Sequence, residues 1–167
     1  MIRLTNLKEY FTPLVDSGTS VKIAFDYEPI YDIDEEGNKV ESNIGTWTEH
    51  VFKKRPSFNQ IQEFILSEIN RRTDELILSG FIWKDMSVWL SSENQFNYKA
   101  AYDLAVQTQG ESLPYKVKLG GEDAPVYREF TSLQDFKAFY LSVQKHINGT
   151  INDGWKRKDA IDWSKYQ

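Results

Sequence analysis

Apolar and polar residues alternate one by one from Val21 to Ile33, the pattern of a β-strand with one buried face. Pro29 has no amide hydrogen to donate to a neighbouring strand, so we expect this strand to lie at an edge or to carry a bulge at Pro29. Six residues of this strand share the predicted buried face. They are Val21, Ile23, Phe25, Tyr27, Tyr31 and Ile33.

Turn residues follow this strand and predict a long hairpin. Gly37 and Asn38 suit a tight turn, and the segment TWTEHVF (residues 46–52) supplies the returning strand.

The segment before this hairpin has four apolar residues at helical spacing. They are Leu4, Leu7, Phe11 and Leu14. Pro13 stops the pattern after about two turns, and a helix this short is not stable alone. We therefore expect an N-terminal arm that folds back on the body, with docking on a neighbouring protein as the alternative.

Three later helices are predicted from the same capping-box pattern, in which a hydroxyl residue is followed three positions later by glutamine. The pairs are Ser57 and Gln60, Ser92 and Gln95, and Thr131 and Gln134. Gly80 is placed to end the first helix. The last helix has a continuous apolar stripe from Leu133 to Ile147, and we expect it to be long, with a possible break near Gly149.

The middle helix follows the polar and aromatic stretch WLSSENQFNYKAAYDLA. Phe96, Ala100 and Leu104 lie one turn apart on one face of it. Local rules thus favour a strand running into a helix here over a binding site.

Two further hairpins are predicted between the helices. FIWKDMSVWL turns near Lys84 and Asp85, and YKVKLGGEDAPVYREF turns through Gly120 and Gly121. Strands that come in pairs separated by helices predict an α+β fold, in which antiparallel hairpins pack on about three helices and the C-terminal helix is long. We divide the chain into an N-terminal arm (1–20), a β-hairpin extension (21–56) and an α+β body (57–167) that forms one compact unit.

Composition narrows the classes of function. The net charge is −5 and the basic residues form two short runs at 53–55 and 156–158, which disfavours nucleic acid binding. The chain has no Cys, which excludes disulfides and thiolate chemistry. No apolar run reaches the length of a membrane span, so we expect a soluble protein made in a cytoplasm.

Candidate chemistry is sparse, and we predict no catalytic residues, no metal and no cofactor. His50 and His146 are the only histidines and lack any metal-binding spacing. The segment DIDEEG, residues 32–37, matches the start of a calcium loop, but the twelfth position is Asn43 and not glutamate. A solvated acidic hairpin tip is the favoured interpretation.

Three segments resemble a known family. They are RRTDELILSGFIWKDMSVWLSSENQFNY, PVYREFTSLQDFKAFYLSVQKHI and KRKDAID. Together, over residues 71–161, they resemble a domain of unknown function found in tail-associated and tail-fibre-assembly proteins of bacteriophages and prophages. The resemblance supplies no catalytic residues. It implies a phage virion protein of the tail or baseplate, made in the bacterial host cytoplasm. It does not cover the first 52 residues, and we expect these to adapt a common body to a particular neighbour.

The function expected from these observations is a non-enzymatic structural or assembly protein that binds other phage virion proteins through its arm, its first hairpin and exposed aromatic residues. A glycan- or receptor-binding module that uses exposed aromatic rings is the alternative, and carboxylate catalysis is a weaker third reading. Seven residues are the candidate partner contacts. They are Leu4, Leu7, Phe11, Trp47, Trp83, Trp89 and Tyr98.

Overall fold

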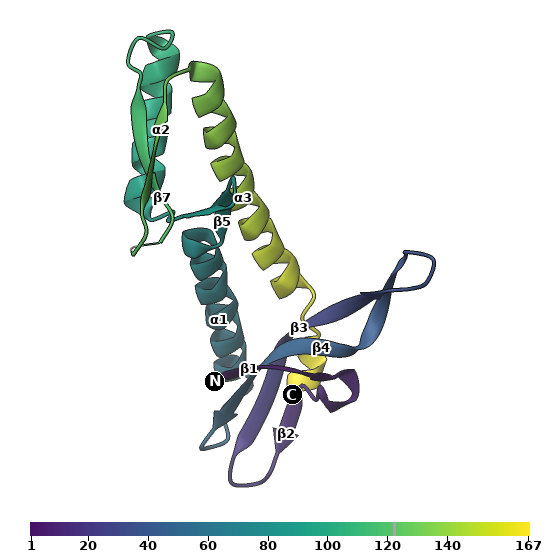
Figure 1. Ribbon diagram of the computed structural model, residues 1–167. Coiled ribbons are helices and arrows are strands. Elements are labelled where there is room, and N and C mark those ends of the chain that lie inside the picture. The colour runs from purple at the N-terminus through teal and green to yellow at the C-terminus, as the bar shows by residue number, and fades with distance from the viewer. Residues whose placement is uncertain (122) are drawn as a thin grey trace. The chain divides into compact units, whose positions relative to one another are not determined.

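The computed structural model describes residues 1–121 and 123–167, and it confirms the predicted α+β class (Figure 1). The helices are α1 (Phe58–Ser79), α2 (Ser92–Gln107) and the long α3 (Leu133–Asp159), with two 3-10 turns, η1 (Lys8–Tyr10) and η2 (Trp163–Tyr166). The strands are β1 (Ile2–Leu7), β2 (Leu14–Asp16), β3 (Val21–Ile33), β4 (Lys39–Phe52), β5 (Phe81–Trp83), β6 (Met86–Val88), β7 (Tyr115–Leu119) and β8 (Val126–Phe130). Every strand pair is antiparallel.

The chain forms two compact units. Unit 1 comprises Met1–Ile69 and Lys156–Gln167, and unit 2 comprises Asn70–Trp155. Both divisions fall inside helices, one in α1 and one in α3, so each of these helices contributes residues to both units. Within residues 1–121 and 123–167, none of the helices combines the length and the hydropathy that a membrane span requires.

Unit 1 contains a four-stranded sheet in the order β1-β4-β3-β2. The predicted helical arm is wrong, because residues 2–7 form β1 and pair with β4, which places Leu4 opposite Trp47 and Leu7 opposite Ile44. The edge of β4 offers main-chain hydrogen-bond partners along the whole segment, whereas a two-turn helix would leave most of its terminal groups unpaired.

A β-bulge in β3 shifts its register relative to β4, so the two halves of β3 pair with β4 in different registers. Phe25 lies opposite Thr48 and Glu28 lies opposite Thr46, so three steps along β3 match two along β4. Within this bulge Asp26 has φ 56°, a left-handed conformation that few residues other than glycine adopt. A second irregularity lies beside Pro29, where the two steps from Pro29 to Tyr31 match four steps along β4, from Gly45 to Glu41. The pairing is thus irregular at Pro29 as expected, but the extra residues lie in β4 and not in β3.

The bulge is held by charged hydrogen bonds. Arg3 Nη1 donates to Asp26 Oδ2 at 3.1 Å and to Thr48 Oγ1 at 3.1 Å, and Arg3 Nη2 donates to Glu28 Oε2 at 2.7 Å. Arg157 Nη1 lies 3.9 Å from Asp26 Oδ1. The Asp26 side chain is only 3% exposed, so its carboxylate depends on these partners for stabilisation.

The same bulge reverses the face on which the following residue lies. Cross-strand partners share a face, so Glu28 takes the position beside Phe25 and Tyr27 turns to the opposite face. There the Tyr27 ring stacks on Trp47 with centroids 6.3 Å apart, and a Cβ at Gly45 would come within 2.3 Å of the Tyr27 ring. The prediction that Tyr27 shares the face of Phe25 is therefore wrong.

The other face of the sheet packs on α1 and on the end of the chain. The buried members of this core are Val21, Ile23, Phe25, Ile61, Ile65, Ile69 and Tyr166. The three isoleucines are four residues apart on α1, so they form one stripe. Tyr166 in η2 donates its hydroxyl to the carbonyl oxygen of Ala24 at 2.8 Å, which ties the last turn of the chain to β3.

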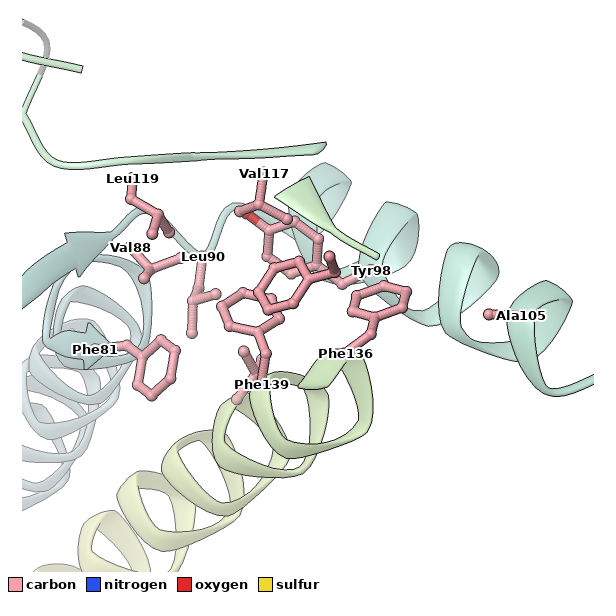
Figure 2. Close-up of a cluster of buried hydrophobic side chains, with 11 residues drawn as sticks. Phe81, Val88, Leu90, Tyr98, Ala105, Val117, Leu119, Phe136 and Phe139 are labelled. Carbon is pink, nitrogen blue, oxygen red and sulfur yellow. The ribbon is translucent and has the colours of Figure 1, made fainter. Parts of the chain in front are cut away.

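Unit 2 has a separate core built around phenylalanines of α3 (Figure 2). Its buried members are Phe81, Val88, Leu90, Tyr98, Ala105, Val117, Leu119, Phe130, Phe136, Phe139 and Val143. The ring centroid of Phe139 lies 5.0 Å from that of Phe130 and 5.3 Å from that of Tyr98. The two hairpins turn as predicted, with positive φ at Lys84, Asp85 and Gly120.

The face of α2 that contacts this core is not the one that carries Phe96, Ala100 and Leu104. Phe96 is 70% exposed and Leu104 is 51% exposed, whereas Tyr98 and Ala105 are buried. Two apolar stripes with helical spacing lie on α2. The stripe that carries Tyr98 and Tyr102 faces the core, because both rings pack against phenylalanines of α3.

The first predicted helix cap is confirmed and the second is displaced by one residue. Ser57 N donates to Gln60 Oε1 at 2.8 Å, and Gln60 N donates to Ser57 Oγ at 3.3 Å. At α2 the cap is Ser91 and not Ser92, and its hydroxyl accepts from the main-chain amide of Asn94.

At α3 the capping hydroxyl is Ser132, which accepts from Asp135 N at 3.2 Å, and the predicted cap at Thr131 is wrong. Both displaced caps lie in a pair of adjacent hydroxyl residues. Either hydroxyl of a pair can cap the helix. The residue that does so is the one whose start position orients the large aromatic side chains of the helix toward the core.

Helix α3 is continuous through Gly149 and Gly154, without the predicted break. A Cβ at Gly149 would meet nothing within 4 Å. At Gly154, which is buried, a Cβ would lie 2.6 Å from Thr73 Oγ1 of α1, so only glycine permits this close approach within unit 2.

We expect the two α3 glycines to respond in opposite ways to alanine. Gly149→Ala should raise the free energy of unfolding by about 1 kcal/mol, because alanine favours the helix and the space is open. Gly154→Ala should lower it by roughly 1–3 kcal/mol, because Thr73 is branched and cannot move aside freely. Urea denaturation followed by circular dichroism measures both, and equal effects would contradict the close approach.

We expect Arg3→Met to lower the free energy of unfolding by about 3 kcal/mol, because it removes a partner of the buried Asp26. Lys8→Met is the control, since the Lys8–Glu41 pair in the same unit is exposed and solvent-screened and should contribute little to stability. Chemical denaturation of both variants tests this, and an Arg3→Met protein as stable as the control would contradict it.

Candidate functional site

The seven predicted contact residues differ widely in exposure. Leu4, Leu7, Phe11 and Trp83 are half-buried. Trp47 and Tyr98 are 1% and 5% exposed, so they are core residues and form no contact surface in this structure. Of the seven, only Trp89 presents most of its side chain to solvent, with 54% exposed.

The structure brings some of these residues together within each unit. In unit 1, Phe11 and Trp47 lie edge to face at 5.7 Å, and Tyr27 completes the cluster. In unit 2, the Trp83 and Tyr98 rings both pack on Phe139, which accounts for their burial. These aromatic residues stabilise the fold.

A groove of about 470 Å³ opens in unit 2 beside Trp89. Its walls come from the end of β6, the first turn of α2 and the turn after β7. The side chains and glycines that shape it are Ser87, Trp89, Asn94, Lys118, Gly120 and Gly121. An aromatic ring, an amide, a hydroxyl and an amine therefore line one cavity.

Two hydrogen bonds to main-chain carbonyl oxygens fix the walls of this groove. Asn94 Nδ2 donates to the carbonyl oxygen of Trp89 at 2.8 Å, which joins the first turn of α2 to the end of β6. Gly120 N donates to the carbonyl oxygen of Ser87 at 2.8 Å, which joins the β7–β8 hairpin to β6. The groove is thus a preformed feature of unit 2.

A second exposed feature is the end of the β3–β4 hairpin, which we call the hairpin tip and define as residues 31–41. Strand β1 pairs with residues 44–49 of β4 and β2 pairs with residues 21–23 of β3, so the hairpin tip is only two strands wide (Figure 1). Tyr31, Ile33 and Val40 are exposed on it.

The turn of the hairpin tip is organised by Asp34. Its Oδ1 accepts from Asn38 N at 2.7 Å and from Glu36 N at 3.0 Å, and these hydrogen bonds, chiefly that from Asn38, lower the pKa of Asp34. The Asp34 carboxylate, which the sequence offers as a calcium ligand, therefore stabilises the turn by accepting main-chain hydrogen bonds. The part of the chain that the structure describes holds no cluster of three or more acidic or histidine residues suited to a metal ion.

Both histidines occupy packing positions. His50 stacks on Phe64 with centroids 4.2 Å apart, and burial lowers its pKa. His146 Nε2 donates to the carbonyl oxygen of Leu76 at 3.1 Å and helps to close the end of α1.

A smaller pocket of about 260 Å³ in unit 1 lies beside Asp26, Tyr27 and Arg157. Its charges already serve the protein, since Asp26 pairs with Arg3 and Asp162 caps η2 by accepting from Ser164 N. This pocket therefore lies beside the ion pairs that hold the bulge, and its charged groups have structural roles.

Sequence reasoning expected the first hairpin to be a contact surface, but it placed Tyr31 and Ile33 on a buried face, whereas both are exposed. It also missed the exposed apolar residues on the outer face of α2. The sequence signal that could have shown the exposure of the hairpin tip is that the predicted hairpin is longer than the segments available to pair with it. For α2 the signal was the presence of two competing apolar stripes.

Comparisons of the chain with protein-family models, with curated proteins and with solved structures found no match. The resemblance to phage tail-associated proteins therefore rests on the sequence segments alone.

We expect His50 to make unit 1 less stable as pH falls. Its pKa in the folded state lies below the ordinary 6.5, through burial first and the N-terminal amine second, with Glu68 opposing. The unfolded chain then binds a proton first, so this stability is present above about pH 6.5 and is lost as pH falls through the folded pKa. Urea unfolding at pH 7.5 and 5.5 measures the loss.

His50→Gln should flatten this pH dependence, and His146→Gln is the control that should retain it. An unchanged slope in His50→Gln would show that burial of His50 has no such effect.

Proposed function

We propose that the chain is a non-enzymatic structural or assembly protein of a phage tail or baseplate that acts by binding other virion proteins. The sequence resemblance supplies the phage context, with synthesis in the bacterial host cytoplasm. The single structural observation that carries the proposal is the hairpin tip.

A two-stranded ribbon is marginally stable in water, so a long one with exposed apolar side chains gains stability when a partner covers it. Tyr31 and Ile33 share a face with their cross-strand partners Glu41 and Lys39, while Val40 lies opposite Asp32 on the other face. Each face of the hairpin tip thus combines apolar and charged groups, which suits insertion between partner surfaces.

The charge of the hairpin tip specifies the partner further. Residues 31–41 contain five carboxylates and one lysine. A partner groove with apolar walls and a basic rim would complement it, and the opposite charges would accelerate association.

Catalysis is not part of the proposal. The two histidines make packing contacts and a main-chain hydrogen bond, and Asp34 holds a turn. These contacts give each of the residues a role in the fold.

The test is quantitative mass spectrometry of purified particles and tail precursors of the encoding phage, which counts copies relative to the major capsid protein. We expect a fixed, low copy number in one or both. The double variant Tyr31→Ser/Ile33→Ser should reduce it at least tenfold, because the apolar contacts of the hairpin tip are lost.

The matched control is Val15→Ser/Val51→Ser, which removes two exposed apolar residues from the same sheet outside the hairpin tip. Its copy number should equal that of the wild type. Absence of the wild-type protein from particles and precursors, or normal incorporation of the hairpin tip variant, would contradict the proposal.

A further inference from the structure

The Trp89 ring is a preorganised platform. Its neighbours Val88 and Leu90 are both 1% exposed, so the backbone between them is anchored and the Trp89 side chain points outward. Its carbonyl oxygen is held by Asn94, and Leu90 N donates to the carbonyl oxygen of Leu78 at 2.8 Å. Among the described residues no aromatic ring packs on Trp89, so its face is available to a ligand at little entropic cost.

Polar groups of the groove remain available beside this platform. Asn94 uses its Nδ2 on Trp89, which leaves Oδ1 to accept a hydrogen bond from a ligand hydroxyl. The Ser87 hydroxyl has no partner among residues 1–121 and 123–167, and it can donate or accept. A flat apolar ring next to such groups complements a sugar, which has an apolar face and a rim of hydroxyls.

Lys118 gives the groove its charge preference. It lines the groove and forms no ion pair within the described part of the chain, whereas Lys116 on the same strand pairs with Glu129 at 2.9 Å. A single ammonium group complements a single carboxylate, while a phosphate dianion calls for several donors. Tyr127, which pairs with Lys118 across the hairpin, is exposed.

A peptide strand does not suit the groove. Strand β6 is paired with β5 on one side, and the Ser87 carbonyl on the other side already accepts from Gly120. The groove therefore lacks the free main-chain edge that strand addition needs.

We infer that this groove binds a carboxylate-bearing sugar, with the sugar ring on Trp89, its hydroxyls on Asn94 and Ser87, and its carboxylate on Lys118. This function goes beyond the contacts proposed for the hairpin tip. It rests on unit 2 alone, so a failure of either proposal leaves the other standing.

The test is a titration of the ¹⁵N-labelled full chain with methyl glucuronide, methyl galacturonide and a methyl sialoside at millimolar concentrations. The chain has five tryptophans, so the indole signal of Trp89, identified with Trp89→Phe, is read against four internal controls. We expect a saturable shift of this signal and of the Gly121 amide with at least one acidic sugar. The neutral methyl glucoside and galactoside should bind about tenfold more weakly.

Lys118→Met should weaken binding of the acidic sugar about tenfold, and the matched control Lys116→Met should leave it unchanged. Unaltered signals of the other indoles show that each variant is folded. The inference is overturned if no acidic sugar shifts the Trp89 signal, if the neutral sugars bind equally well, or if Lys118→Met binds like the wild type.

Discussion

A carboxylate buried within a sheet requires cationic partners, and in unit 1 this requirement links distant parts of the chain. Asp26 lies in a bulge of β3 and is held by Arg3 from β1 and approached by Arg157 from the end of α3. The N-terminal strand therefore does more than extend the sheet, because it stabilises the left-handed conformation of Asp26. With the bulge fixed, Tyr27 is turned onto Trp47, so β3 buries Phe25 on one face and packs the half-buried Tyr27 on the other.

The two proposed binding features follow from different physical constraints. The hairpin tip exists because β3 and β4 are much longer than β1 and β2, so their far ends lack neighbouring strands. The groove exists because Trp89 is the outward residue between two buried ones where β6 turns into α2. The first is a two-stranded, acidic extension suited to another protein, and the second is a fixed cavity suited to a small polar ligand.

Much of the fold could be predicted because local signals agreed with tertiary packing. The turn at Lys84 and Asp85, the cap at Ser57 and the end of α1 at Gly80 depend on neighbouring residues alone. The remaining features depended on contacts that sequence periodicity does not encode. Residues 2–7 became a strand because β4 offered an edge, Tyr27 changed face because of the bulge, and α2 turned its tyrosines inward because phenylalanines of α3 receive them. The groove was missed because local rules explained the stretch around Trp89 without it.

Nuclear Overhauser effects from the ring protons of Tyr27 test the central claim most directly. If the clamped bulge turns Tyr27 as described, strong effects should connect its ring to the α protons of Gly45 and to the indole of Trp47, and the Gly45 α protons should be shifted upfield by the ring. Effects from Tyr27 to Ile65 of α1 would contradict it, because they would place Tyr27 on the face of Phe25, where uninterrupted alternation would put it.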